Sequence, residues 1–342
     1  YLGLAHHPQV VEAYKQAAEA YGVGSGASHL ISGYHQPHYD LEQAFAKFLR
    51  RDRALLFNTG YMANIGVLQA LSRDQDVIYQ DKLNHASLID AGLLAKAKMQ
   101  RYAHRDFTHL KNLLARQTQG QKFIVTDGVF SMGGDLAPLP ELIALAQAEQ
   151  ACLIVDDAHG IGILGSSGGG VAEHFNVTQR ELPVLICPLG KAFGCFGAVV
   201  AGSDLIIESL VQFARTYIYT TAIPPALACA ALASLKIISV ESERREYLYA
   251  LIDYFKKAAV AQGIALVEST TPIQSLILGS ATRAINLQKY LYAHGFLTSN
   301  IRPPTVPTNT SRLRITLSCL HTHEHIDQLL KAINNALNLN KI

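Results

Sequence analysis

Two short stretches of the chain carry residue types that could do chemistry. Asp156, Asp157 and His159 follow the apolar run at residues 152–155, and Lys191 follows a second apolar run at residues 184–187. Short apolar, partly β-branched runs between polar segments are typical of strands that are buried on both faces. Ligands of open α/β sheets bind at the carboxyl ends of the strands. We therefore expect these polar side chains to meet at one sheet edge.

An acid and a lysine at one sheet edge suit a particular kind of cofactor. Pyridoxal 5'-phosphate (PLP) needs a carboxylate at its ring nitrogen and an amine at its aldehyde. Asp156 and Lys191 are the candidates for these two tasks. The simpler interpretation is that the paired aspartates only form a turn and that the lysine is solvated.

Two glycine patterns in the same region do not predict nucleotide binding. Gly160, Gly162 and Gly165 match G-x-G-x-x-G, but a Ser- and Gly-rich stretch follows where that fingerprint requires a helix. Lys191 follows a glycine, yet Ala192 stands where a P-loop has Ser or Thr. We interpret both matches as fortuitous.

Composition restricts the class of protein. Of the 342 residues, 49% are hydrophobic and 16% charged, which excludes a disordered chain and fits an oligomer that hides much of its surface. A net charge of +2 without a basic block argues against nucleic acid as a partner. The five cysteines form no C-x-x-C pair, which predicts reduced thiols and a cytoplasmic location. No apolar run reaches the length of a membrane span, so we expect no membrane partner.

The order of expected elements predicts an α/β fold. Strands and helices alternate over residues 54–200, which favours a mostly parallel sheet flanked by helices. From residue 241 the pattern changes to that of a smaller α+β unit. We expect a large domain at 1–238, with an N-terminal segment missing because the chain opens without Met, and a small domain at 239–342. The strands expected lie at 54–57, 76–79, 122–125, 152–155, 184–187, 197–201, 265–267, 274–278, 299–302 and 313–317, and the main helices at 8–21, 39–49, 138–150, 225–240, 241–262, 283–294 and 326–339.

One turn is a candidate phosphate site. Residues 58–61, Asn-Thr-Gly-Tyr, separate an expected strand from a helix that starts near Met62. This arrangement directs free backbone N–H groups at an anion. Every strand-to-helix turn resembles it to some degree, so the pattern alone does not show that this turn binds phosphate.

Taken together, these motifs resemble the α-oxoamine synthases, PLP enzymes with the aspartate-aminotransferase-like fold (PLP fold type I). The resemblance runs from Tyr1 to the last helix. It implies a PLP-dependent acyltransferase, and Arg312 to Thr316 together with the segment at 301–307 favours the biotin-forming member. The matching segments are NHASL at 84–88, GVFSM at 128–132, DDAHG at 156–160, GK at 190–191 and IRPPTVP at 301–307.

The resemblance implies catalytic and cofactor-binding roles. Lys191 would carry PLP as a Schiff base and later move the Cα proton of the substrate. Asp156 would keep the pyridine nitrogen protonated, and His85 would stack on the ring. His159, counted with these as catalytic, and Ser131 would donate hydrogen bonds to the phenolic oxygen of PLP.

The resemblance also implies how phosphate is bound. Gly60 and Tyr61 would offer backbone N–H groups. Thr220 and Thr221 would reach the phosphate from the partner subunit, which implies a homodimer with shared active sites.

Substrate binding is implied for two arginines. Arg314 would bind the carboxylate of L-alanine, and Arg302 would meet the far carboxylate of a pimeloyl group carried by coenzyme A or a carrier protein. Arg302 could equally form a structural ion pair. The reaction implied joins the two substrates with loss of CO2 to give 8-amino-7-oxononanoate, in biotin biosynthesis. Glycine-using or long-chain acyl enzymes of the family, or a catalytically silent relative, are the alternatives.

Two positions depart from the family pattern. Pro188 stands three residues before Lys191, where the family has a Thr or Ser that binds phosphate. Asp127 stands before Gly128, where many relatives have Glu.

Overall fold

A computed structural model of the protein describes residues 1–117 and 119–338. The chain divides into two compact units. The larger unit consists of Leu4–Val129 and Ala137–Glu241, and the smaller unit of Tyr1–Gly3, Phe130–Leu136 and the chain from Ser242 onward. The structure itself divides the chain at Ser242. The domain limits that we expect from the sequence remain a proposal.

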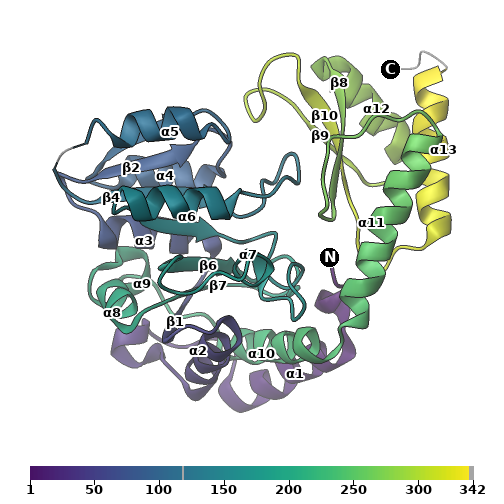
Figure 1. Cartoon of the computed structure of the whole chain (residues 1–342). Coiled ribbons are helices and arrows are strands. Elements are labelled where there is room, and N and C mark those ends of the chain that lie inside the picture. Colours follow the sequence, from purple (N-terminus) through teal and green to yellow (C-terminus); the bar gives the residue numbers. More distant parts are fainter. Residues whose placement is uncertain (118, 339–342) are drawn as a thin grey trace. The chain divides into compact units, whose positions relative to one another are not determined.

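The larger unit is built on a seven-stranded sheet with the order β1-β7-β6-β5-β4-β2-β3 (Figure 1). Strands β3, β2, β4, β5 and β6 run parallel to one another, and only β7 runs opposite to its neighbours β6 and β1. The mostly parallel sheet expected from the sequence is thus confirmed. The strands are β1 (Arg53–Phe57), β2 (Val77–Asp81), β3 (Lys98–Tyr102), β4 (Lys122–Asp127), β5 (Cys152–Asp156), β6 (Val184–Pro188) and β7 (Ala198–Gly202).

Strand β3 has no counterpart among the expected strands. Its sequence Lys-Met-Gln-Arg-Tyr lacks an apolar run, and only Tyr102 is buried. The strand lies at the edge of the sheet, paired with β2 alone. An edge strand tolerates polar side chains, so hydrophobicity could not reveal it.

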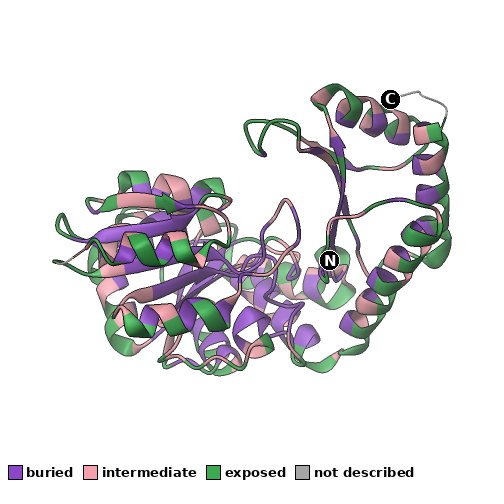
Figure 2. Cartoon of the chain, turned by 45° about the horizontal axis from the view of Figure 1, so that its top comes forward, coloured by how far each residue is buried: buried purple, intermediate pink, exposed green. Residues whose placement is uncertain are grey.

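Helices cover the sheet of the larger unit on both faces. The central strands are buried nearly throughout, as their purple colour in Figure 2 shows. One core cluster joins alternate strand residues, such as Ile154 and Ile186, to helices α3, α4 and α8. The helices are α1 (Pro8–Tyr21), α2 (Gln36–Leu49), α3 (Gly60–Leu71), α4 (Ala86–Leu94), α5 (Phe107–Leu114), α6 (Leu139–Ala148), α7 (Gly170–His174), α8 (Asp204–Phe213), α9 (Arg215–Ile218) and α10 (Pro225–Val240), with a 3-10 turn at Leu4–His6 and a π-helical turn at His29–Gly33.

The smaller unit is an α+β structure. Its sheet has the order β8-β10-β9, with both pairs antiparallel. Residues 265–267, expected as a strand, are irregular, and the only backbone bond recorded there runs from Val267 N–H to Ser275. The elements are β8 (Ile273–Gly279), β9 (Ser299–Ile301), β10 (Ser311–Thr316), α11 (Glu243–Ala261), α12 (Ala281–Ala293) and α13 (His323–Asn338). The end expected for the last helix, Leu339, lies outside the described residues.

No single helix of the described residues is long and apolar enough to cross a membrane, although α10 and α11 taken together have that length and composition.

Candidate active site

The carboxylate of Asp156 lies at the end of β5, at the carboxyl edge of the parallel strands. It is 4% exposed. Its Oδ1 accepts the backbone N–H of Ala158 at 3.0 Å, and its Oδ2 accepts the side-chain amide of Asn64 on α3 at 2.7 Å. Both donors are neutral, so the negative charge remains available to a cationic group.

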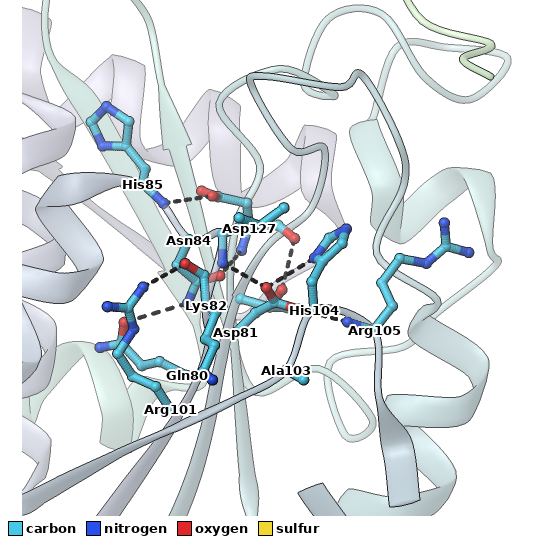
Figure 3. Close-up of polar contacts among 12 residues, drawn as sticks. Gln80, Asp81, Lys82, Asn84, His85, Arg101, Ala103, His104, Arg105 and Asp127 are labelled. Atoms are coloured by element: carbon cyan, nitrogen blue, oxygen red, sulfur yellow. Dashed lines mark hydrogen bonds and ion pairs between the residues drawn. The ribbon is translucent and has the colours of Figure 1, made fainter. Parts of the chain in front are cut away.

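His85 is held at the start of α4 by its own backbone. Its N–H donates to Oδ2 of Asp127 at 2.7 Å, as Figure 3 shows. Its ring Nδ1 caps the helix by accepting the backbone N–H of Ser87 at 3.2 Å. The ring remains accessible to solvent, while partial burial lowers the pKa of His85; the charge of Asp156 opposes that shift and the charge of Lys191 adds to it.

Asp127 and Asp156 are direct neighbours on the paired strands β4 and β5. Burial, and then the negative charge of Asp156, raises the pKa of Asp127 well above its usual range, and the bond from His85 N–H opposes that rise. Asp127 is one of the two positions that we expect to depart from the family pattern. The shorter side chain nevertheless reaches the backbone of His85.

A second carboxylate fixes the loop that carries His85. Asp81, at the end of β2, accepts the backbone N–H groups of Leu83 and Arg105 at 2.8 and 3.0 Å, and its Oδ1 lies 2.9 Å from Nδ1 of His104 (Figure 3). Asn84 then binds the next strand, donating to Val125 at 2.8 Å and accepting from Asp127 N–H at 3.2 Å. Side chains from strands β2 and β4 and from the loop itself therefore define where His85 lies.

Lys191 lies in the connection between β6 and β7, which are neighbouring antiparallel strands. Backbone bonds from Leu189 to Gly197 and from Cys195 to Leu189 close the base of this loop, both near 3 Å. Phe193 is fully buried below it. Lys191 itself is half-buried, and its positive charge acts on the pKa values of His85, Asp127 and Asp157. The lysine and the acids thus share one region, as expected.

Asp157 has a different task from Asp156. Its Oδ2 accepts the backbone N–H of Val171, in α7, at 2.8 Å. Burial raises the pKa of Asp157 well above its usual range. A β-carbon at Gly160 would lie 2.1 Å from its Oδ1, and one at Gly170 1.9 Å from its Oδ2. Gly160, the first glycine of the apparent nucleotide motif, and Gly170 therefore pack against a buried carboxylate.

The turn before α3 has the form of an anion site. The hydroxyl of Thr59 accepts the N–H of Met62 at 3.1 Å. The N–H groups of Gly60 and Tyr61, in the first turn, have no carbonyl partner within the helix. They and the positive end of the helix dipole are suited to a phosphate.

Thr220 and Thr221 lie beside the turn of their own chain. The side-chain amide of Asn58 donates to the carbonyl of Thr221 at 2.8 Å and approaches the hydroxyl of Thr220 at 3.4 Å. That these two threonines contact the phosphate bound by the partner subunit remains a prediction.

The remaining predicted residues fall into two groups. His159 is buried in the turn after β5, in the larger unit. Ser131, Arg302 and Arg314 belong to the smaller unit. There, Arg314 on β10 is hydrogen-bonded to the hydroxyl of Tyr1, and its Nε has no hydrogen-bond partner among the described residues. Arg302 is exposed and forms no ion pair with a described residue.

Sequence reasoning missed Asn64. It is fully buried among the apolar residues of α3 and binds Asp156 across 92 positions of sequence. The available signal was an amide side chain within the otherwise apolar run at residues 62–68, since a buried polar group needs a partner.

These residues fit PLP. The carboxylate of Asp156 has neutral donors only, the ring of His85 is open to stacking, and the turn before α3 offers two N–H groups. Lys191, whose charge acts on the same groups, supplies the amine.

Comparison with known proteins decides the family. The model of the class I and II aminotransferases matches residues 1–333. This chain belongs to that family. Within it, the 8-amino-7-oxononanoate synthases of Pseudomonas paraeruginosa and Thioalkalivibrio sulfidiphilus are similar to this chain. The first is 53% identical, covering 98% of this chain and 84% of the relative, and the second 51% identical, covering 98% and 86%.

Solved structures of the family agree with the fold. The 8-amino-7-oxononanoate synthase from Francisella tularensis matches with a TM-score of 0.87 and 35% identity, covering 100% of this chain and 97% of the other. Serine palmitoyltransferase from S. paucimobilis, solved with bound PLP, matches with a TM-score of 0.95 and 29% identity, covering 100% and 87%. The expected PLP fold type I and the PLP dependence of the family are thereby confirmed.

Proposed function

We propose that this chain binds PLP and catalyses the decarboxylating condensation of L-alanine with a pimeloyl thioester, giving 8-amino-7-oxononanoate, CO2 and the free thiol carrier. The observation that carries this proposal is the identity of about half of all residues, over nearly the whole chain, with proteins named 8-amino-7-oxononanoate synthase. The arrangement of Asp156, His85 and Lys191 supports it, because the charges of Asp156 and Lys191 both act on the pKa of His85.

The protein residues divide the chemical work as follows. When bound, PLP would supply an electron sink for chemistry at the amino-acid Cα. Lys191 would hold the cofactor and then move the Cα proton. Asp156 would keep the ring nitrogen positively charged, since an opposite charge nearby favours the protonated form. His85 would stack on the ring, and the bond from its backbone N–H to Asp127 fixes its position.

The substrate carboxylates are assigned to the arginines of the smaller unit. Among the described residues, the Nε–H of Arg314 has no acceptor, and the carboxylate of alanine would supply one. Arg302 is assigned to the far carboxylate of the pimeloyl group. Its side chain is exposed and forms no ion pair with a residue that the structure describes, which supports this role over a structural one. Ser131 and His159 are assigned to the phenolic oxygen of PLP.

The working unit that we propose is a homodimer in the cytoplasm. Thr220 and Thr221 are assigned to the phosphate site of the partner subunit. Both lie at the turn before α3, beside the residues that we assign to phosphate. Exposed apolar side chains in the same unit, among them Ile31 and Tyr219, support a subunit contact. Coenzyme A and a carrier protein are both compatible carriers of the acyl group.

A second candidate is the condensation of an amino acid with a long-chain acyl thioester. The high TM-scores to serine palmitoyltransferase favour it. The backbone is shared across the family, however, whereas substrate choice depends on side chains. Identity near 30% to that enzyme, against 53% to the 8-amino-7-oxononanoate synthase of Pseudomonas paraeruginosa, therefore favours the pimeloyl substrate.

Borohydride trapping tests the proposal. Purified protein incubated with PLP should absorb in the visible range, and borohydride should abolish that absorbance while attaching the cofactor irreversibly to Lys191. Peptide mapping by mass spectrometry locates the label. A label on another lysine, or no incorporation, would disprove the assignment. Turnover of alanine with pimeloyl, acetyl and palmitoyl thioesters then separates the two candidate functions.

A further inference from the structure

A buried chain of hydrogen bonds connects Asp156 to His85 through two residues that have no role in the reaction described above. The amide nitrogen of Asn64 lies 2.7 Å from Oδ2 of Asp156 and 2.7 Å from Oγ of Ser87. The Ser87 oxygen lies 2.8 Å from Nδ1 of His85. Asn64 is completely buried and Ser87 is 2% exposed.

The direction of each bond follows from the chemistry of the groups. The Asn64 amide must present its nitrogen to Asp156, because an oxygen there would face a carboxylate oxygen. An amide nitrogen only donates, so Ser87 Oγ accepts from Asn64. The hydroxyl hydrogen of Ser87 is then free to point at Nδ1 of His85.

The same argument determines which ring nitrogen of His85 carries the proton. The backbone N–H of Ser87 also points at Nδ1, at 3.2 Å. A backbone N–H can only donate, so Nδ1 is an acceptor without hydrogen. Burial lowers the pKa of His85 and favours the neutral ring. Its single proton therefore resides on Nε2.

Asn64 is a costly residue for structure alone. It lies among Ala63, Ile65 and Val67 in a helix whose buried residues are otherwise apolar. Its amide oxygen has no hydrogen-bond partner within the described part of the chain. An unbonded buried polar atom destabilises a fold, so an apolar residue would serve packing better.

We propose that Asn64 is a positioning residue that, together with Ser87, holds the Asp156 carboxylate and the Nε2–H tautomer of His85 in one fixed arrangement. A ring flip of His85 would place a C–H against Ser87 and lose two bonds, so the network also fixes the plane that is available for stacking. This inference rests on the proposed function in so far as Asp156 and His85 hold PLP.

The tautomer can be measured without any cofactor. In protein labelled with nitrogen-15 histidine, long-range proton–nitrogen correlation spectra distinguish Nε2–H from Nδ1–H, and a His85→Gln variant identifies the His85 signals. We expect the Nε2–H form in the wild-type protein at neutral pH. An Nδ1–H form would overturn the proposal, whatever the activity of the enzyme.

Substitutions test the network itself. Asn64→Ala removes a bond to a charged group and should weaken PLP binding roughly ten- to hundredfold. Ser87→Ala should weaken it roughly two- to tenfold and give a mixture of His85 tautomers, and Ser87→Thr, which keeps the hydroxyl, should restore both. The matched control is Ser72→Ala at the end of α3, the helix that carries Asn64, where a buried hydroxyl bonded to Leu68 at 2.6 Å forms no hydrogen bond with Asp156, Ser87 or His85 among the described residues. It should lower stability only.

The possible outcomes are distinguishable. Wild-type PLP affinity and an unchanged tautomer in Ser87→Ala would overturn the proposal, as would equal losses in Ser87→Ala and Ser72→Ala. If Asn64→Ala does not fold, the wild-type tautomer and the serine variants decide. Wild-type protein that shows the Nε2–H tautomer but binds no PLP would support the network and contradict the proposed function.

Discussion

Pro188 packs directly on Gly60: a β-carbon at Gly60 would lie 2.7 Å from Cγ of Pro188. Gly60 opens α3, whose first N–H groups we assign to the PLP phosphate, and Pro188 ends β6. The residue that departs from the family pattern thus touches the proposed phosphate site. Its ring stands where the resemblance leads us to expect a hydroxyl that binds phosphate.

Replacing this proline should improve cofactor binding. Pro188→Thr restores a hydroxyl beside the phosphate, and one additional hydrogen bond should lower the Kd of PLP by roughly two- to tenfold. Fluorescence titration of cofactor-free protein measures the change. Pro188→Ala is the matched control, because it also removes the ring but adds no donor. Equal affinities of the Thr and Ala variants would refute the idea that a phosphate ligand is missing.

Mixed dimers test whether the active sites are shared. Lys191→Ala and Thr221→Ala chains, combined and reassembled, should regenerate one intact site in each mixed dimer if Thr221 serves the neighbouring subunit. Activity should then exceed that of either parent. Asn58 contacts Thr221 within one chain, so the alternative is that Thr221 serves the active site of its own subunit. Activity no higher than that of the parents would assign Thr221 to its own subunit.

Arg302 should determine the preference for a dicarboxylic acyl group. A hydrogen bond to a charged group contributes about 1.5–3 kcal/mol, which corresponds to roughly ten- to hundredfold in kcat/KM. Wild-type protein should prefer the pimeloyl thioester to the uncharged heptanoyl thioester by about this factor, and Arg302→Ala should lose the preference while keeping its heptanoyl rate. A preference that survives the substitution would point to another residue.

Glu42 should make stability depend on pH. Its carboxylate accepts the Tyr34 hydroxyl at 2.6 Å and the Leu56 N–H at 2.8 Å. Burial raises the pKa of Glu42 from 4.5 to about 7. The folded protein therefore holds this proton more tightly than the unfolded chain does. The contribution of Glu42 to stability is complete below pH 4.5 and decreases as pH rises to about 7, by roughly 3 kcal/mol in total.

A Glu42→Gln variant isolates this effect, because it keeps an oxygen for the Leu56 N–H and does not titrate. Between pH 5 and pH 8 its unfolding free energy relative to wild type should shift in its favour by roughly 2–3 kcal/mol. Urea unfolding at fixed protein and PLP concentrations provides the measurement, since ligand and assembly also alter stability. A constant difference between the two proteins over this range would mean that Glu42 does not titrate there.

Much of the fold follows from local sequence. The apolar runs at β5 and β6 and the helices α1 and α10 agree with expectation, because the hydrophobicity of each side chain indicates whether that residue is buried. The placement of Asp156 and Lys191 at one sheet edge follows too, since the carboxyl ends of parallel strands share that edge.

Other features were decided only by the tertiary structure. Residues 265–267 have the composition of a strand but form none, and β3 is a strand without an apolar run, because pairing depends on neighbours far along the chain. The bonds of Asn64 to Ser87 and Asp156 span 23 and 92 positions. No local pattern specifies such partners. They meet because α3, α4 and β5 pack together, and that packing gives a buried amide the two acceptors that its NH2 group requires.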